Sequence, residues 1–196
     1  MIGGGQDQEQ KRISADLNLK ANQLQIWAEQ DVSILAVCGG FQLFGKWYRD
    51  SKGNYLAGVE IFDMTTIAPR IANFRAVGDI WVTSNIKDIG DVVGFENHAG
   101  QSYLGPQGSS FATVKYGNGN NGLDRTEGAF YRNVVGTYLH GSVLPKNPML
   151  LDYLLANALN HRYDEDLKPK FSSPSPFVLQ AQSTAMEVTL RKSEKR

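Results

Sequence analysis

The sequence predicts an α/β protein built in three layers around a mostly parallel sheet, and three observations support this. Residues 32–37 (VSILAV) form a short apolar run rich in β-branched residues, which is typical of a strand buried on both faces. The polar segment 7–31 carries scattered apolar residues that suit one or two helices lying on a sheet. Leucines recur at helical spacing in residues 148–159, and Pro148 suits the first turn of such a helix.

Length and composition fit one ordinary domain and exclude several classes of function. The chain has 196 residues, of which 41% are hydrophobic, enough to bury a core. The 20 basic residues balance the 20 acidic ones, so the chain has no global field to hold nucleic acid or an anionic membrane. A single cysteine excludes an internal disulfide, and no apolar run has the length of a membrane span. We therefore expect a cytoplasmic protein that neither spans a membrane nor binds nucleic acid.

The middle of the chain predicts short strands separated by glycine, asparagine and aspartate. They are expected at residues 78–82, 91–95, 111–114 and 134–138. The Ser/Pro stretch and the charged end of the tail are typical of a segment outside the core. We therefore divide the chain into one domain, residues 1–165, and a C-terminal extension, residues 166–196.

The chain opens on a glycine turn at residues 3–5. In a doubly wound sheet such a turn follows a strand, and only Met1 and Ile2 stand where that strand would be. We therefore expect a domain that lacks its N-terminal strand–helix segment, with a loss of stability and activity.

Residues 36–40 (AVCGG) have the pattern of a nucleophile elbow. A buried strand runs directly into Cys38, and the small residues around it suit a tight strand-to-helix turn. A helix that begins there would lower the pKa of the thiol, and the amide of Gly39 would donate to an oxyanion. The same pattern fits a buried cysteine that only fills the core.

A cysteine nucleophile needs a base, and the chain has three histidines. His140 follows the predicted strand at 134–138, and the carboxyl ends of parallel strands meet at one edge, where Cys38 would also lie. His98 lies in a loop-like segment, and His161 fits a solvated helix end. The residues alone do not decide between His140 and His98.

Several motifs together resemble class I glutamine amidotransferases. Residues 38–42 (CGGFQ) resemble the C-x-G-x-Q segment around the nucleophile, and residues 3–5 resemble the glycine turn that supplies another oxyanion amide. Residues 136–141 (GTYLHG) are similar to the segment that carries the base in the cobyric-acid-synthase-like branch. Three further segments resemble the GatD-like glutaminase subunits of lipid II isoglutaminyl synthases: residues 3–10, 94–98 and 144–148. The resemblance covers roughly residues 2–160.

The resemblance implies a set of site residues. The catalytic pair would be Cys38 and His140. The substrate-binding residues would be Arg75, Gln42, Asn97, Gly4 and Gly39. Arg75 resembles the position of the family's glutamine-binding arginine, and a guanidinium fork suits an α-carboxylate. An ordinary surface arginine is the equally weighted alternative.

The chain departs from the wider class after the histidine. Many class I enzymes carry a glutamate two residues later, and Ser142 stands there in this sequence. The resemblance therefore implies a Cys–His dyad. Glu96 and Asp124 are candidates for an orienting group, although no pattern supports either.

The resemblance also implies a two-subunit amidotransferase. This chain would hydrolyse glutamine, with no cofactor or metal of its own, and a Mur-ligase-like partner, MurT, would use ATP and Mg²⁺ to activate the α-carboxyl of D-glutamate in lipid II. The released ammonia would convert it to D-isoglutamine for peptidoglycan synthesis. Two alternatives stay open: the amidotransferase of a cobyrinate-type cobalamin pathway, and a catalytically silent interaction subunit.

Overall fold

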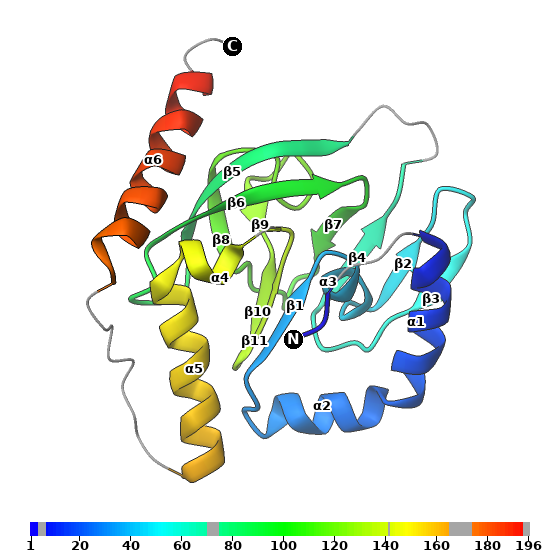
Figure 1. The fold of residues 1–196 in the computed structure, drawn as a ribbon. Coiled ribbons are helices and arrows are strands. Elements are labelled where there is room, and N and C mark those ends of the chain that lie inside the picture. The colour runs from blue at the N-terminus through cyan, green and yellow to red at the C-terminus, as the bar shows by residue number, and fades with distance from the viewer. Residues whose placement is uncertain (4–6, 70–74, 141, 165–173, 194–196) are drawn as a thin grey trace.

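The computed structural model describes residues 1–3, 7–69, 75–140, 142–164 and 174–193 (Figure 1).

The polar front of the chain forms two helices, as the sequence predicts. Helix α2 (Ala21–Glu29) follows α1 (Asp7–Leu19) directly and runs in a different direction (Figure 1). They bury Leu17, Leu24 and Ala28 against the rest of the fold. The sparse apolar residues of this segment therefore form the face that packs on the core.

The central sheet has the order β1-β11-β10. Strand β1 (Ile34–Val37) lies parallel to β11 (Val134–Thr137), and β10 (Ala129–Tyr131) pairs antiparallel with β11. Ile2 adds a parallel bridge to the other side of β1, opposite Ala36. Every residue of β11 is buried, which explains why its sequence is a continuous run without polar alternation.

Helices cover both faces of this central sheet. Successive residues of a strand point to opposite faces. Accordingly Ile34 and Ala36 belong to one buried cluster with Leu24 of α2. Leu35 belongs to a second cluster with Leu150 of α5 (Pro148–Tyr163). The predicted α/β layering is therefore confirmed at β1 and β11.

Two further sheets flank the central one. The sheet of order β3-β2-β4-β7 contains β2 (Trp47–Arg49), β3 (Tyr55–Ala57), β4 (Met64–Ile67) and β7 (Gln101–Leu104). The sheet of order β6-β5-β8-β9 contains β5 (Ala76–Ser84), β6 (Asp91–His98), β8 (Ala112–Tyr116) and β9 (Thr126–Glu127). Two short helices, α3 (Gly39–Leu43) and α4 (Val143–Lys146), follow β1 and β11.

The prediction of a mostly parallel sheet is wrong. Among the named strands only β1–β11 and β2–β4 pair in parallel, and the other pairings are antiparallel. A parallel pair needs a long crossover, usually a helix, whereas short turns join antiparallel strands. In the described part of the chain between α3 and α4 the connections are short and carry no helix, so neighbouring strands reverse direction.

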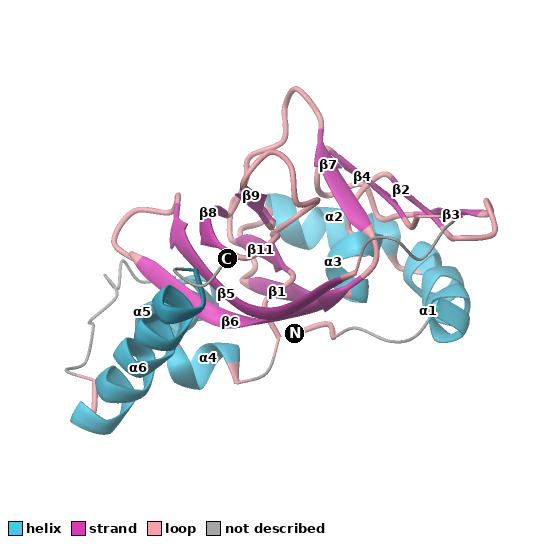
Figure 2. Cartoon of the chain, turned by 90° about the horizontal axis from the view of Figure 1, so that it is seen from above, coloured by secondary structure: helices cyan, strands magenta, loops and turns pink. Residues whose placement is uncertain are grey.

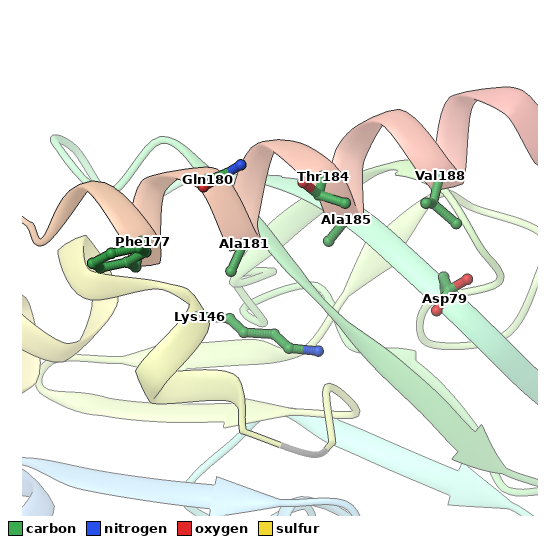
Figure 3. Close-up of a pocket in the computed structure, with 8 residues that line it drawn as sticks. All are labelled: Asp79, Lys146, Phe177, Gln180, Ala181, Thr184, Ala185 and Val188. Carbon is green, nitrogen blue, oxygen red and sulfur yellow. The ribbon is translucent and has the colours of Figure 1, made fainter.

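Part of the predicted C-terminal extension is a helix that packs on a sheet. Helix α6 (Pro176–Ser193) lies along β5 and β6 (Figure 2). The Gln182 side chain donates to the carbonyl of Asp91 at 3.1 Å, and Thr189 is buried. An open surface pocket of about 520 Å³ lies between this helix, Lys146 and Asp79 (Figure 3). The domain boundary at residue 165 stays a prediction.

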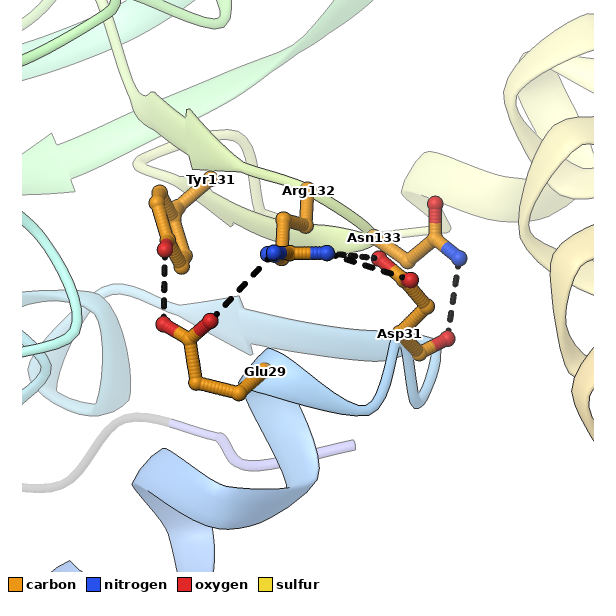
Figure 4. A network of polar contacts seen from close by, with 5 residues as sticks. All are labelled: Glu29, Asp31, Tyr131, Arg132 and Asn133. Atoms are coloured by element: carbon orange, nitrogen blue, oxygen red, sulfur yellow. Dashed lines mark hydrogen bonds and ion pairs between the residues drawn. The ribbon is translucent and has the colours of Figure 1, made fainter.

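Polar contacts join the turns that precede β1 and β11 (Figure 4). Arg132 reaches Asp31 at 3.2 Å and Glu29 at 3.4 Å, and the Asn133 side chain donates to the carbonyl of Asp31 at 2.9 Å. The hydroxyl of Tyr131 donates to Glu29 at 2.6 Å. Such exposed ion pairs contribute only about 0–1 kcal/mol each. They lie at the start of the two parallel strands whose far ends carry the predicted chemistry.

No helix within the described ranges is long and apolar enough to cross a membrane.

Candidate active site

Cys38 stands at a sharp turn between β1 and α3. Its φ and ψ are 54° and −110°, a region that residues other than glycine rarely adopt. Its N–H donates to the carbonyl of Thr137 at 2.9 Å, and its own carbonyl accepts the N–H of Gln42 at 2.9 Å. Backbone strain of this kind costs on the order of 1–3 kcal/mol and persists where the surroundings fix it. The structure therefore has the elbow geometry that the sequence predicts.

The glycines around the elbow allow a close backbone approach. A Cβ on Gly40 would lie 2.8 Å from the carbonyl oxygen of Ile2 and 3.2 Å from that of Gly3. Only glycine fits there without displacing the first residues of the chain. The N-terminal glycine turn thus begins against the elbow, although Gly4, a predicted site residue, lies outside the described residues.

The environment of Cys38 acts on its thiol in opposite directions. Burial raises the pKa of Cys38, while the Gly39 N–H and the positive charge of Arg75 lower it, and burial has the largest effect. The expectation that the turn lowers the pKa below its ordinary value is therefore wrong in its net direction. A thiol in this state needs a base to remove its proton.

His140 lies at the same sheet edge as Cys38. Thr137 stands opposite Val37 in the parallel register, so His140 follows β11 closely, just as Cys38 follows β1. The N–H of His140 donates to the carbonyl of Phe95 at 2.7 Å, which fixes its backbone. Its Nε2 is buried and has no hydrogen-bond partner among the described residues. Burial lowers the pKa of His140, which favours the neutral imidazole that a general base requires.

His98 is buried and makes contacts within the protein core. Its ring stacks on that of Tyr138 with centroids 3.6 Å apart and an angle of 7°. Its Nδ1 lies 2.8 Å from the carbonyl oxygen of Gly100, and this nitrogen carries the proton because a carbonyl only accepts. Burial lowers the pKa of His98 to about 4. His161 is exposed in the last turn of α5. His98 is thus held by contacts within the core, and the choice of His140 as the base stays a prediction.

The buried His98 predicts a loss of stability in acid. Its pKa falls from 6.5 to about 4 on folding, so the unfolded chain binds more protons in this window. The free energy of unfolding should therefore decrease as the pH falls from about 6.5 to 4, by at most about 1.4 kcal/mol per pH unit. We expect His98→Phe, which keeps an aromatic ring on Tyr138 but cannot titrate, to lose less stability over this window. Denaturant unfolding of both proteins at several pH values measures the difference, and equal slopes would contradict it.

Arg75 and Asn97, both predicted to bind substrate, contact each other. The Nε and Nη2 atoms of Arg75 donate to Oδ1 of Asn97 at 3.2 and 2.8 Å. Asn97 lies in β6 opposite Val77 of β5. Arg75 and Asn97 are both exposed. The charge of Arg75 acts on the pKa of Cys38 and of His98. The charge of Arg75 therefore reaches the surroundings of Cys38, and its contact with a substrate stays a prediction.

Gln42 belongs to a buried polar network. Its Nε2 donates to the hydroxyl of Tyr138 at 3.0 Å, and that hydroxyl lies 2.8 Å from Oγ of Ser102. A Cβ on Gly100 would lie 2.5 Å from the same Nε2 atom, so the amide is tightly enclosed. Direct contact between Gln42 and a substrate stays a prediction.

The two candidate orienting carboxylates accept hydrogen bonds from the backbone of turns. Glu96 is buried and accepts the N–H groups of Asn118 and Gly119 at 2.9 and 3.0 Å. Asp124 accepts the N–H of Thr126 at 2.9 Å and its hydroxyl at 2.7 Å. Both carboxylates therefore stabilise turns. Among the residues that the structure describes, no three or more His, Cys, Asp and Glu side chains gather as metal ligands.

Glu127 is a residue of this region that the sequence did not predict. Its carboxyl is fully buried and accepts the N–H of Tyr138 at 2.7 Å and the hydroxyl of Thr137 at 3.0 Å. The surrounding residues 126–128 (TEG) have the composition of an ordinary exposed turn. No local signal in the sequence indicates that this carboxyl is buried against residues 137 and 138, which precede His140.

Comparisons with known proteins agree with this geometry. A model of the CobB/CobQ-like glutamine amidotransferase domain matches residues 1–148. The chain is also similar to a solved structure of a glutamine amidotransferase, with a TM-score of 0.58 and 14% identity over 80% of this chain and 76% of that one. At this identity the likeness shows the fold alone.

Curated relatives extend the comparison. Subunit GatD of the glutamine-hydrolysing lipid II isoglutaminyl synthase is 37% identical in Streptococcus pneumoniae, over 85% of this chain. The Staphylococcus aureus subunit is 40% identical over 82%. The chain spans 63% of the length of each. Cobyric acid synthase of Listeria monocytogenes is 32% identical over 61% of this chain and 24% of that protein. With a family model that matches most of its length, the chain belongs to the CobB/CobQ-like glutamine amidotransferase domain family.

Proposed function

We propose that this chain hydrolyses glutamine to glutamate and ammonia, with Cys38 as nucleophile and His140 as base. The observation that carries the proposal is the backbone of Cys38, whose φ of 54° and ψ of −110° put the thiol on a strained turn after β1. The buried Nε2 of His140, without a partner in the described part of the chain, follows the neighbouring parallel strand. A core cysteine needs neither feature, since packing alone does not require a strained turn.

The reaction follows from these positions. His140 takes the proton of the Cys38 thiol, and the thiolate attacks the side-chain amide carbon of glutamine. The oxyanion that forms accepts the N–H of Gly39, at the start of α3. His140 returns its proton to the leaving nitrogen, ammonia departs, and a glutamyl thioester remains. His140 then removes a proton from water, and the hydroxide attacks the thioester carbon. The carbon–sulfur bond breaks, glutamate leaves, and His140 returns the proton to the Cys38 sulfur.

Arg75 would hold the α-carboxylate of glutamine beside this pair. We expect Arg75→Lys to raise the KM for glutamine about tenfold with kcat little changed. Lysine keeps the positive charge but cannot form the bidentate hydrogen bonds that a guanidinium makes to a carboxylate. Steady-state ammonia release gives both constants. Arg125→Lys is the matched control, because the Arg125 guanidinium donates to the carbonyl of Val114 in a loop contact. An unchanged KM in the Arg75 variant would return this residue to an ordinary surface role.

We propose further that the ammonia serves a lipid II isoglutaminyl synthase. The support is the identity of 37% and 40% to two subunits of that enzyme over more than four fifths of this chain. The partner would be a Mur-ligase-like subunit, MurT, that holds ATP and Mg²⁺ and amidates the D-glutamate of lipid II to D-isoglutamine. This chain would act as a heterodimer subunit in the cytoplasm.

The rival assignment is a cobyrinate-type amidation in cobalamin synthesis. Its support is the 32% identity to a cobyric acid synthase, which extends over a smaller part of the chain. A catalytically silent subunit is a third possibility, against which the elbow at Cys38 argues.

One co-expression experiment separates the three functions. The chain is purified with a Mur-ligase-like subunit, and ammonia release from glutamine and ATP-dependent amidation of lipid II and of a cobyrinate-type substrate are measured. We expect glutamine hydrolysis and amidation of lipid II alone. Amidation of the corrinoid would establish the rival, and absence of glutamine hydrolysis in the complex would establish a silent subunit.

A further inference from the structure

The Glu127 carboxyl fixes the segment that leads to His140. Its Oε1 accepts the N–H of Tyr138 at 2.7 Å and the hydroxyl of Thr137 at 3.0 Å. The Thr137 hydroxyl in turn accepts the N–H of Leu139 at 3.0 Å. Residues 137–139 lie at and beyond the end of β11. There the Glu127 side chain, in place of a neighbouring strand, accepts a backbone hydrogen bond. Glu127 is therefore hydrogen-bonded to Thr137 and Tyr138 directly, and to Leu139 through the Thr137 hydroxyl.

The same segment also holds the nucleophile. The carbonyl of Thr137 accepts the N–H of Cys38 at 2.9 Å, which anchors the strained elbow. Thr137 thus donates a hydrogen bond to Glu127 through its hydroxyl and accepts one from Cys38 at its carbonyl. His140 follows Leu139 directly in the sequence. A shift of residues 137–139 would move the thiol and the imidazole relative to each other.

We propose that Glu127 is a positioning residue, which sets the relative geometry of Cys38 and His140 through Thr137 and Tyr138 without touching the substrate. The role differs from that of a glutamate that orients the imidazole, since the bonds of Glu127 go to the backbone and to a hydroxyl. The inference rests on the proposed glutamine hydrolysis for its kinetic readout.

The protonation of Glu127 indicates which substitutions are informative. Burial raises the pKa of Glu127 to about 8, and the charge of Glu96 acts in the same direction. The hydrogen bonds from Tyr138 and Thr137 act in the opposite direction, and the net effect on the pKa favours the uncharged carboxyl. Glutamine has the same shape, no charge and the same acceptor oxygen, so Glu127→Gln keeps the contacts. Methionine fills a similar volume without an acceptor, so Glu127→Met removes them.

The test compares these two variants in the full chain. We expect Glu127→Met to lower kcat for glutamine hydrolysis about 100-fold per folded molecule, as for a small misplacement of reacting groups, with KM little changed. Glu127→Gln should retain most of the activity. The pH profile of Cys38 alkylation by iodoacetamide is a second readout, and its midpoint should rise in Glu127→Met and stay in Glu127→Gln.

Asp50→Leu is the matched control for general destabilisation. Asp50 is a buried carboxylate that accepts the N–H groups of Lys52 and Asn54 at 2.9 and 2.8 Å, in the turn between β2 and β3. Its loss removes similar bonds from a different element, so we expect lower stability and an unchanged kcat per folded molecule. If Glu127→Met does not fold, Thr137→Val is compared with Thr137→Ser, which keeps the hydroxyl that joins Glu127 to Leu139.

Several results would overturn the positioning role. They are an unchanged kcat in the folded methionine variant, a glutamine variant as impaired as the methionine one, or the same kcat loss in Asp50→Leu. Absence of glutamine hydrolysis in the native complex with the partner subunit would instead contradict the proposed function. The alkylation profile then decides alone, and an equal midpoint in Glu127→Met and the native chain would overturn the positioning role.

Discussion

Replacement of Cys38 by alanine should abolish glutamine hydrolysis and leave the fold intact. Removal of a covalent nucleophile lowers kcat by about four orders of magnitude or more, because both halves of the reaction pass through the thioester. The side chain is only partly buried, so its truncation creates little cavity. Ammonia release from glutamine measures the activity, and denaturant unfolding measures the stability.

Cys38→Ser is the control for shape at this position. Serine keeps a hydroxyl of similar size on the same strained backbone, so its fold and its glutamine binding should match those of the native chain. Its turnover should remain near that of the alanine variant, because a serine hydroxyl is a far weaker nucleophile than a thiolate. Substantial turnover by Cys38→Ala would remove this residue from the chemistry.

His140→Ala should be the second most damaging change. A positioned general base contributes on the order of 10²–10⁴-fold, and His140 acts in both the formation and the hydrolysis of the thioester. The partly buried imidazole has no hydrogen-bond partner at Nε2 within the described residues, so its loss should cost little stability. Single-turnover kinetics with glutamine measure the two steps, and both should slow.

Two histidine variants serve as controls for the base. His98→Phe keeps the ring stack on Tyr138, and His161→Ala changes an exposed helix end. Both should retain far more activity than His140→Ala. A lower rate in the His98 variant than in the His140 variant would transfer the role of base to His98.

Local sequence predicted the elements whose signals are themselves local. The apolar run before Cys38 became β1, the polar front became α1 and α2, and the leucine stripe became α5. The mostly antiparallel pairing of the strands was not predictable in this way, because strand direction depends on connections and on partners far along the chain. Helix α6 was missed because its weakly apolar sequence, which follows the Ser/Pro stretch, gives little sign of the sheet surface on which it packs.

The same distinction holds for the candidate site. A small-residue pattern indicated the elbow at Cys38, whose geometry is set by a few adjacent residues. The choice of His140 came from the resemblance and stays a prediction, and the stack of His98 on Tyr138 was not predictable, because it joins residues 40 positions apart. Glu127 could not be predicted, because its importance lies in bonds to residues 137 and 138 that only the folded chain brings beneath it.

Covalent labelling tests the central claim, that Cys38 attacks the side chain of glutamine. The full chain is treated with diazo-oxo-norleucine, an electrophilic glutamine analogue, and its peptides are analysed by mass spectrometry. We expect one adduct, on Cys38, which excess glutamine suppresses and which Cys38→Ser lacks. An adduct on another residue, or an active chain that the analogue does not label, would contradict the account.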